Sequence, residues 1–396
     1  MFIPHRAVLD AITKYFPPSR LAYRPASDSW DFEGRGITVG ELMRIIAFET
    51  DLPGAKVQNT LTAIAWQRRE QTLALLKAWV RFSDERAGHD DAELRAWLRL
   101  MQRAGTSEVA HEAHVVAMKQ WIWQVKRAVL EQGVVWHVAP IFWSTENGTG
   151  KSYNLRRLIS PIAAFTRNLD VDELGEKFSG RMFAQTLVAF LDEFAGAEHA
   201  NVGQLKAILT GKPIDARSMF SESGFYAENR MSCIASSNVP PPHNFVDTTG
   251  ARRFWSIHCS SAVMLDGDER MTAFDAIDID AVWASVASHA KSPQYTAEGC
   301  VLDYMDRQRE ESLRSKTSLE SFCEECLEAD AGERIPLKEF QERYRQYCAS
   351  SRQLAIRGGY KALSDLLTTQ GYDCVNLSNR RYLRGQSFVD FERLND

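Results

Sequence analysis

Apolar residues recur at helical spacing through the first eighty residues of the chain. They form one stripe at Val39, Leu42, Ile45 and Ile46, and a second at Leu61, Ile64, Leu73 and Leu76. A period of three to four residues predicts amphipathic helices with one face toward a core. We therefore expect a helical N-terminal domain over 1–82. The polar stretch Ser83–Asp91 has no apolar period, and we interpret it as a linker.

The middle of the chain changes from helical to β-rich patterning. Helical spacing continues over Leu94–Met101 and His111–Leu130, and three apolar runs then end in polar residues. These runs are Val134–Ser144, Thr186–Glu193 and Met231–Asn238. Buried strands that alternate with helices predict a largely parallel α/β sheet, which binds ligands at the carboxyl ends of its strands. We place this domain, with the helices before it, at 92–310.

The C-terminal part has a third pattern. Helical spacing is found at Leu319–Glu328, Leu337–Tyr347 and Tyr360–Gln370, and short β-like pieces follow at Tyr372–Leu377 and Arg381–Leu383. Three helices with a β-hairpin predict a winged helix over 315–396.

Composition sets limits on the class of protein. Of the 396 residues 44% are apolar and 25% are charged, and no apolar run is long enough to cross a bilayer. The first residues carry charges rather than a signal core, so we expect a cytoplasmic protein with no membrane contact. The net charge is −5, so contact with a nucleic acid would require a local cationic patch.

Two sequence features resemble metal sites and are better explained otherwise. Cys323 and Cys326 have zinc-like spacing, but they lie in a helical pattern without a second pair of ligands, and a helix face is the better interpretation. His111 and His114 are one residue too close for a zinc-binding H-E-x-x-H helix. The seven cysteines do not suggest a disulfide framework.

The strongest local signal for chemistry is the segment Thr145–Ser152 between a predicted strand and a predicted helix. Backbone amides of such a loop bind phosphates, Lys151 neutralises their charge, and the Ser152 hydroxyl can ligate Mg²⁺. Thr145 departs from the P-loop pattern, which has glycine there. The alternative is a glycine-rich turn before a helix. The expected nucleotide-binding residues are Glu146, Asn147, Gly148, Thr149, Gly150, Lys151 and Ser152.

Paired carboxylates follow the second predicted strand. Asp192 would hold the Mg²⁺ shell with Ser152, and Glu193 would orient and deprotonate the attacking water. Asn238 ends the third strand, where a neutral amide can hydrogen-bond the γ-phosphate or the lytic water. The plainer interpretations are a helix N-cap for the carboxylates and a turn cap before the prolines for Asn238.

Arg252 and Arg253 follow this last strand and are candidates for an arginine finger. Such a finger stabilises transition-state charge and often comes from a neighbouring subunit. A surface ion pair is the alternative.

The order of these motifs resembles the superfamily 3 helicases, especially the virulence-associated protein E and phage or poxvirus primase-helicase group. The P-loop is followed by LDE, LKAILTGKPIDARSMF, SSNVPP and TGARRFW. The resemblance covers about Val115–His258 well, becomes weak toward the C-terminus and leaves out the N-terminal region. It implies a P-loop (AAA+-like) ATPase core and a channel hairpin with its tip near Ser221–Gly224. The basic positions that match the hairpin are Lys206, Lys212 and Arg217.

Arginine and lysine are in excess in the tail between Gln341 and Gly385, interleaved with tyrosines. This pattern fits DNA binding by a winged helix, with Lys361 on the recognition helix and Arg380 and Arg381 in the wing. Winged helices also bind proteins, which is the alternative.

These patterns lead to a functional prediction: an ATP- and Mg²⁺-dependent DNA helicase in the replication of a phage or mobile element. By the resemblance it would form a homo-oligomeric ring, a hexamer, around single-stranded DNA. The winged helix would bind duplex or single-stranded DNA. The alternatives are an ATP-switched origin-binding protein without unwinding and a remodelling ATPase independent of DNA. Asp278 and Asp280 resemble a primase carboxylate pair, but Asp280 is better explained as a helix N-cap.

Overall fold

The computed structural model describes fourteen segments of the chain, and the elements below belong to them. They are 5–17, 20–86, 90–134, 137–146, 148–169, 185–192, 214–217, 224–227, 229–238, 253–260, 267–314, 318–350, 359–377 and 380–389. For 214–217, 224–227, 267–268 and 310–314 the description is of the backbone alone.

The N-terminal unit contains a small sheet that the apolar pattern did not predict. Helix α1 (Arg6–Tyr15) is followed by β1 (Leu21–Arg24), β2 (Ser29–Phe32) and β3 (Arg35–Ile37), which pair antiparallel in that order. Strands of three or four residues are too short for an alternating pattern to stand out. The buried Trp30 joins this sheet to a core of helix residues that includes Val8, Leu42 and Leu61. The expectation of a mainly helical region did not include this sheet.

Two helices complete this unit, and the second continues into the rest of the molecule. Helix α2 (Val39–Thr50) begins with a capping box between Thr38 and Glu41, and α3 (Gly54–Glu85) has 32 residues. Val57 of α3 lies in the N-terminal core, whereas Val80 lies in the central core. Because α3 continues through Glu85, the segment predicted as a linker begins as ordered helix.

The central domain is built on a five-stranded sheet in which all neighbouring strands are parallel. The strand order is β10-β4-β9-β6-β5. The strands are β4 (Ala139–Trp143), β5 (Thr166–Asn168), β6 (Val188–Leu191), β9 (Ser232–Ser237) and β10 (Phe254–His258). All three apolar runs singled out in the sequence supply strands of this sheet, so the predicted parallel α/β core is confirmed.

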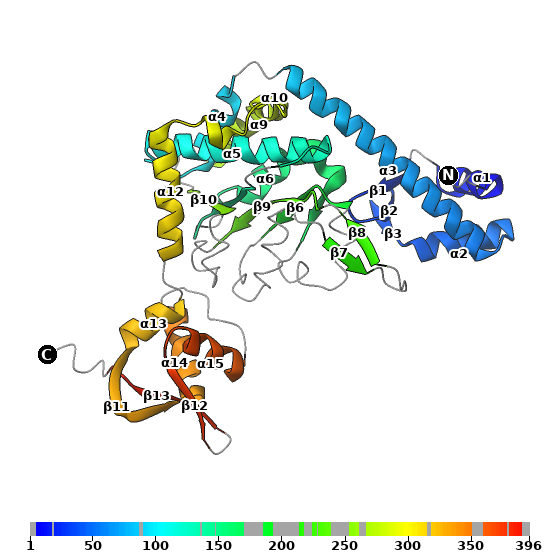
Figure 1. Cartoon of the computed structure of the whole chain (residues 1–396). Coiled ribbons are helices and arrows are strands. Elements are labelled where there is room, and N and C mark those ends of the chain that lie inside the picture. The colour runs from blue at the N-terminus through cyan, green and yellow to red at the C-terminus, as the bar shows by residue number, and fades with distance from the viewer. Residues whose placement is uncertain are drawn as a thin grey trace.

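Helices cover this sheet. Helix α5 (Glu108–Val129) lies along it (Figure 1), is almost entirely buried, and its Trp121 Nε1 donates to the carbonyl of Cys233 in β9 at 2.9 Å. His111 and His114 belong to this helix, as predicted, and both are buried. The other helices are α4 (Ala92–Met101), α6 (Lys151–Leu158), the 3-10 helix η1 (Ser160–Phe165), α9 (Gly267–Ala276), α10 (Ile279–Ala284), α11 (Pro293–Thr296) and α12 (Gly299–Arg314).

Two details near the central domain bear on the sequence predictions. The N-cap of α10 is Asp278, whose side chain accepts from the Ala281 amide at 3.1 Å, so the assignment of the cap to Asp280 was wrong. Asp280 instead accepts from Trp79 Nε1 at 3.1 Å. The antiparallel pair β7 (Ile214–Arg217) and β8 (Gly224–Ala227) forms a hairpin at the predicted position.

The C-terminal unit lies beyond the end of α12 (Figure 1) and has its own core. Its sheet has the antiparallel order β11-β13-β12. Cys323 and Cys326 are buried in this core on one helix, as expected of a helix face. In chain order the elements are α13 (Ser318–Cys326), β11 (Leu327–Pro336), α14 (Leu337–Ser350), α15 (Tyr360–Thr369), β12 (Asp373–Leu377) and β13 (Arg380–Phe388).

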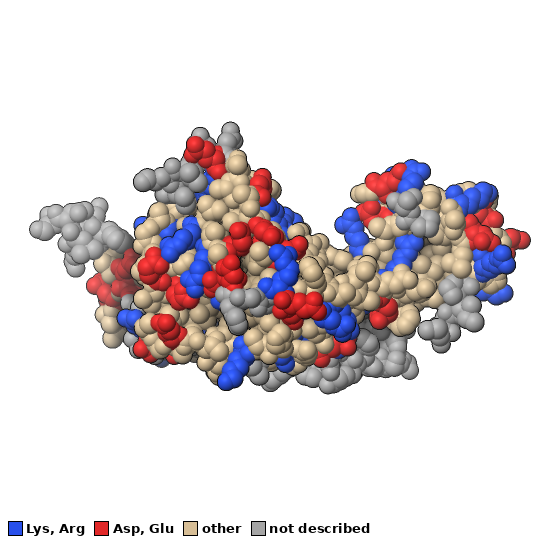
Figure 2. Space-filling view, turned by 90° about the horizontal axis from the view of Figure 1, so that it is seen from above, with Lys and Arg blue, Asp and Glu red and all other residues tan. Residues whose placement is uncertain are grey.

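Two further observations concern the surface. No helix among the described residues is long and apolar enough to span a bilayer. Figure 2 shows cationic and anionic side chains intermingled over the face seen from above. As far as the described residues show, this face therefore offers no broad cationic surface to a nucleic acid.

Candidate functional site

The predicted phosphate loop connects the end of β4 to the start of α6. Gly148 and Gly150 adopt left-handed conformations with φ of 74° and 76°. A Cβ at Gly150 would lie 3.1 Å from Asn154 Nδ2, so a side chain there would be both strained and crowded. The turn brings the chain directly into a helix whose N-terminal amides face the loop, which is the arrangement that binds phosphate.

The Lys151 ammonium group of this loop is hydrogen-bonded to uncharged oxygen atoms. Lys151 is 7% exposed, and its Nζ donates to the carbonyls of Ser144 and Glu146 at 3.5 and 3.4 Å and to Thr149 Oγ1 at 3.1 Å. Burial lowers the pKa of Lys151 below the ordinary lysine value. Since the nearest partners carry no full negative charge, an anion in the loop would be strongly favoured.

Asp192 follows β6 directly and is held by three side chains. Ser152 of α6 and Ser236 of β9 each donate to its Oδ1 at 2.6 Å, and an Arg156 terminal nitrogen lies 2.9 Å from its Oδ2. Burial pushes the pKa of Asp192 upward, but the hydrogen bonds from Ser152, Ser236 and Arg156 outweigh it and keep the pKa low. The carboxylate is therefore ionised and fixed beside the phosphate loop.

The donor set at this point suits Mg²⁺. The Ser152 hydroxyl and the Asp192 carboxylate are hard oxygen ligands, and Mg²⁺ in nucleotide sites uses one or two carboxylates together with substrate phosphates and water. The described residues contain no cluster of three or more His, Cys, Asp or Glu side chains that would form a metal cage. The two groups fit a nucleotide-bound Mg²⁺.

The remaining predicted contacts lie at the same edge of the sheet. Asn238 is exposed and follows β9, directly after Ser237, whose carbonyl accepts from the Ser144 amide at 3.1 Å. Within the loop Thr149 is buried, and the Glu146 carboxylate accepts from Ser260 Oγ at 3.5 Å. The fold thus places Asn238 beside the start of the phosphate loop, as its position at a strand end predicted.

Arg253 lies at the other end of the sheet. It precedes Phe254, which pairs with Ala139 at the amino end of β4, whereas the phosphate loop follows the carboxyl end. Its charge, together with burial as the larger cause, lowers the pKa of His137 to about 4. A strand of five residues spans about 16 Å, so Arg253 is remote from the loop of its own chain.

Several predicted residues lie outside the described residues. They are Asn147, Glu193, Lys206, Lys212 and Arg252. Arg217 is described as backbone within β7. Lys361, Arg380 and Arg381 belong to the C-terminal unit, far along the chain from the phosphate loop.

Sequence reasoning missed Ser236 and Arg156. A serine inside an apolar strand carries no recognisable signal, and its importance follows only from β9 lying between β4 and β6. Arg156 is four residues after Ser152, so the two side chains lie on the same face of α6 and both contact Asp192. Its guanidinium also lies 5.1 Å from the centre of the Phe190 ring, which holds the side chain over the strand.

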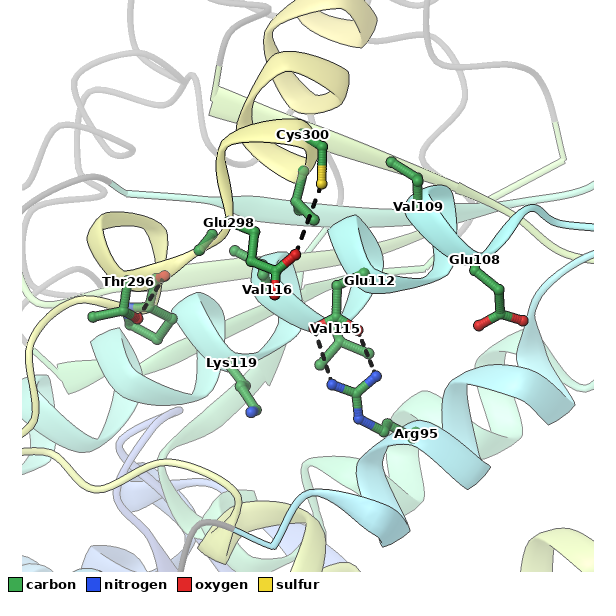
Figure 3. A pocket seen from close by; sticks show the side chains of 13 residues that line it. Arg95, Glu108, Val109, Glu112, Val115, Val116, Lys119, Thr296, Glu298 and Cys300 are labelled. Carbon is green, nitrogen blue, oxygen red and sulfur yellow. Dashed lines mark hydrogen bonds and ion pairs between the residues drawn. The ribbon is translucent and has the colours of Figure 1, made fainter.

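A hollow of 570 Å³ lies elsewhere, between α4, α5 and the segment from Pro293 to Val301 (Figure 3). Its main charges are paired: Arg95 binds Glu112 through two nitrogens at 2.5 and 2.9 Å, and Lys119 lies 2.5 Å from Asp91. It shares no lining residue with the phosphate loop. These ion pairs join α4 to α5, so we assign the hollow no chemistry.

The fold and the loop together define a P-loop protein with an AAA+-like core. The profile of the virulence-associated protein E-like domain matches residues 87–318, more than half of the chain, and the chain belongs to that family. This confirms the resemblance drawn from the motifs. The family match ends at the start of the C-terminal unit and leaves out the N-terminal unit.

Two solved structures are among those similar to this chain. The apo C-terminal region of NrS-1 is 13% identical, with a TM-score of 0.36 over 72% of this chain and 77% of that one. The JCV helicase, bound to a thiazolopyridine phenyl acetamide compound, is 11% identical, with a TM-score of 0.34 over 81% and 96%. No curated protein matches the sequence.

Proposed function

We propose that this chain is an ATP- and Mg²⁺-dependent DNA helicase of superfamily 3 that acts as a ring in the replication of a phage or mobile element. The observation that carries the proposal is the convergence of Lys151, Ser152 and Asp192 at the carboxyl edge of a parallel sheet. Membership in the virulence-associated protein E-like family supports it.

In this proposal the loop amides and Lys151 hold the β- and γ-phosphates of ATP. Ser152 and Asp192 hold Mg²⁺, which neutralises charge on the phosphate oxygens. Asn238, at the same edge, orients the lytic water or the γ-phosphate, and Glu193 accepts the proton of that water. The low pKa of Asp192 keeps it ionised for this role near neutral pH.

The position of Arg253 rules out a contact with the nucleotide of its own chain. Because it lies at the sheet end opposite its own phosphate loop, Arg252 or Arg253 would act on the nucleotide of a neighbouring subunit. A hexamer is the proposed ring size. The β7–β8 hairpin, which contains Arg217 and follows Lys206 and Lys212 in sequence, would line the channel and move one DNA strand.

The C-terminal unit supports a contact with DNA outside the channel. Its order of one helix, one strand, two helices and two strands is that of a winged helix, and its sheet is antiparallel. Lys361 lies near the start of α15, and Arg380 and Arg381 begin β13. We propose that these cations bind DNA phosphates.

The proposal is tested by steady-state ATPase activity with and without single-stranded DNA, and by unwinding of a forked duplex. Lys151→Ala should abolish both activities, whereas Lys56→Ala, an exposed lysine of α3, should retain them. DNA-stimulated hydrolysis without strand separation would favour an ATP-switched origin-binding protein. An ATPase rate that no nucleic acid changes would favour a remodelling ATPase.

A further inference from the structure

The C-terminal unit has a surface hollow of 530 Å³ at the junction of three chain segments. Pro336, Leu337 and Lys338 come from the end of β11 and the start of α14, Tyr360 begins α15, and Arg380 and Arg381 begin β13. We call these six residues the C-terminal hollow. It lies among the α14, α15 and β13 elements of Figure 1.

The described charged side chains that line this hollow are all cationic. Lys338, Arg380 and Arg381 line it, and among the residues that the structure describes no carboxylate does. Within the described residues none of the three has a carboxylate partner, whereas Arg343 and Arg384 nearby are paired with Glu339 and Asp373. Three cations without counter-charges around one hollow attract an anion. The start of α15 adds backbone amides without a side-chain cap.

An aromatic ring lies beside these cations. Tyr360 is 43% exposed, and its carbonyl accepts from an Arg381 terminal nitrogen at 3.3 Å, which fixes the start of α15 against β13. An exposed ring next to unpaired cations is the combination that binds single-stranded nucleic acid, since bases stack on the ring while cations hold phosphates. The volume of the hollow is within the range that admits a nucleotide-sized ligand.

We infer that the C-terminal hollow binds one nucleotide of single-stranded DNA, with a phosphate between Lys338, Arg380 and Arg381 and the base against Tyr360. A concave site with an exposed ring favours a single strand over a duplex, whose bases are stacked inside a convex cylinder of phosphates. The inference rests on the proposed function in taking DNA as the partner. It adds Lys338 and Tyr360, which lie outside the DNA contacts predicted from sequence.

The test measures fluorescence anisotropy of a short 3′-labelled oligodeoxythymidine with the full chain, without nucleotide, over a range of salt concentrations. We expect Arg380→Ala with Arg381→Ala to weaken binding about tenfold or more and to reduce the salt slope by about 0.7, the value for one phosphate of a single strand. Tyr360→Ala should weaken binding about fivefold or more, whereas Tyr360→Phe should retain it. The matched control is Arg384→Ala, on the same strand but outside the hollow and paired with Asp373.

Three results would overturn the inference. One is equal binding by the double arginine variant and wild type, or a loss no greater than that of Arg384→Ala. The second is a loss confined to duplex DNA. The third is displacement of the strand by low concentrations of thymidine monophosphate, which would indicate a site for free nucleotides. Because no ATP is present, the outcome does not depend on whether the chain hydrolyses it.

Discussion

The Ser236 hydroxyl donates a 2.6 Å hydrogen bond to Asp192 Oδ1 from the adjacent parallel strand. The same oxygen accepts from Ser152, which the helix after the phosphate loop supplies. Asp192 Oδ1 therefore connects three elements. They are α6, the strand β6 that Asp192 follows, and the strand β9 that Asn238 follows. Ser236 is a positioning residue, because it acts on the proposed Mg²⁺ site through Asp192.

Removal of the Ser236 hydroxyl should lower the apparent affinity for Mg²⁺ in the ATPase reaction. Ser236→Ala is expected to raise the Mg²⁺ concentration for half-maximal ATPase activity by about tenfold, since a hydrogen bond to a charged group contributes roughly 1.5 kcal/mol or more. Ser236→Thr keeps the hydroxyl and should restore the response. Ser232→Ala makes the same change at the other end of β9 and serves as the control. An unchanged Mg²⁺ titration for Ser236→Ala would contradict the assignment.

Phosphate binding at alkaline pH should be accompanied by the uptake of a proton by Lys151. Burial lowers the pKa of Lys151, so part of this side chain is neutral at a pH where an exposed lysine remains charged. A bound phosphate favours the charged form and raises the pKa, so ATP binding should take up protons in the alkaline range below the ordinary lysine pKa and cease to do so near neutral pH. Titration calorimetry in two buffers of different ionisation enthalpy measures the uptake. Equal binding heats in both buffers at the alkaline pH would show that Lys151 is fully charged in the free protein.

If Arg252 or Arg253 acts on the nucleotide of a neighbouring subunit, two inactive variants should complement each other when mixed. Arg253→Ala and Lys151→Ala should each lack ATPase activity, and their mixture should regain part of it, because a wild-type Arg253 can then face a wild-type Lys151 across a subunit boundary. The same mixing test applied to Arg252→Ala identifies which arginine acts. Mixed oligomers that assemble but remain inactive would rule out the trans role.

The buried ion pair between α3 and α5 should be important for stability. Lys126 Nζ is fully buried and lies 3.0 Å from Asp84 Oδ1, which also accepts from the Ser288 amide. Lys126→Met leaves Asp84 buried without its cation and should lower the free energy of unfolding by about 3 to 5 kcal/mol in urea titrations. Lys77→Met, which removes the partly exposed pair with Glu131, should cost less than about 1 kcal/mol. Similar losses for the two variants would contradict this.

The sequence predicted those parts of the fold that local patterns encode. Long apolar runs supplied strands β4, β6 and β9, and the loop before Lys151 has the predicted strand and helix on either side. Strand order depends on packing between segments far apart in the chain, so the contact of Ser236 with Asp192 could not be read from either residue.

Two small sheets show a different limit of sequence patterns. β11 (Leu327–Pro336) is mostly exposed and polar, so its sequence resembles a loop, and its strand conformation comes from pairing with β13. The β1–β3 sheet is held by Trp30 in the N-terminal core rather than by alternation along any of its strands. In both cases tertiary contacts decide the conformation.

Helix α3 is a long connection between the N-terminal core and the central core. At 1.5 Å per residue its 32 residues extend about 48 Å. One end is fixed in the N-terminal core through Val57, and the other enters the central core through Val80 and binds Lys126 of α5 through Asp84. Helix α5 in turn contacts β9, whose Ser236 holds Asp192. A continuous series of packed and hydrogen-bonded residues therefore connects the N-terminal unit to the carboxylate beside the phosphate loop.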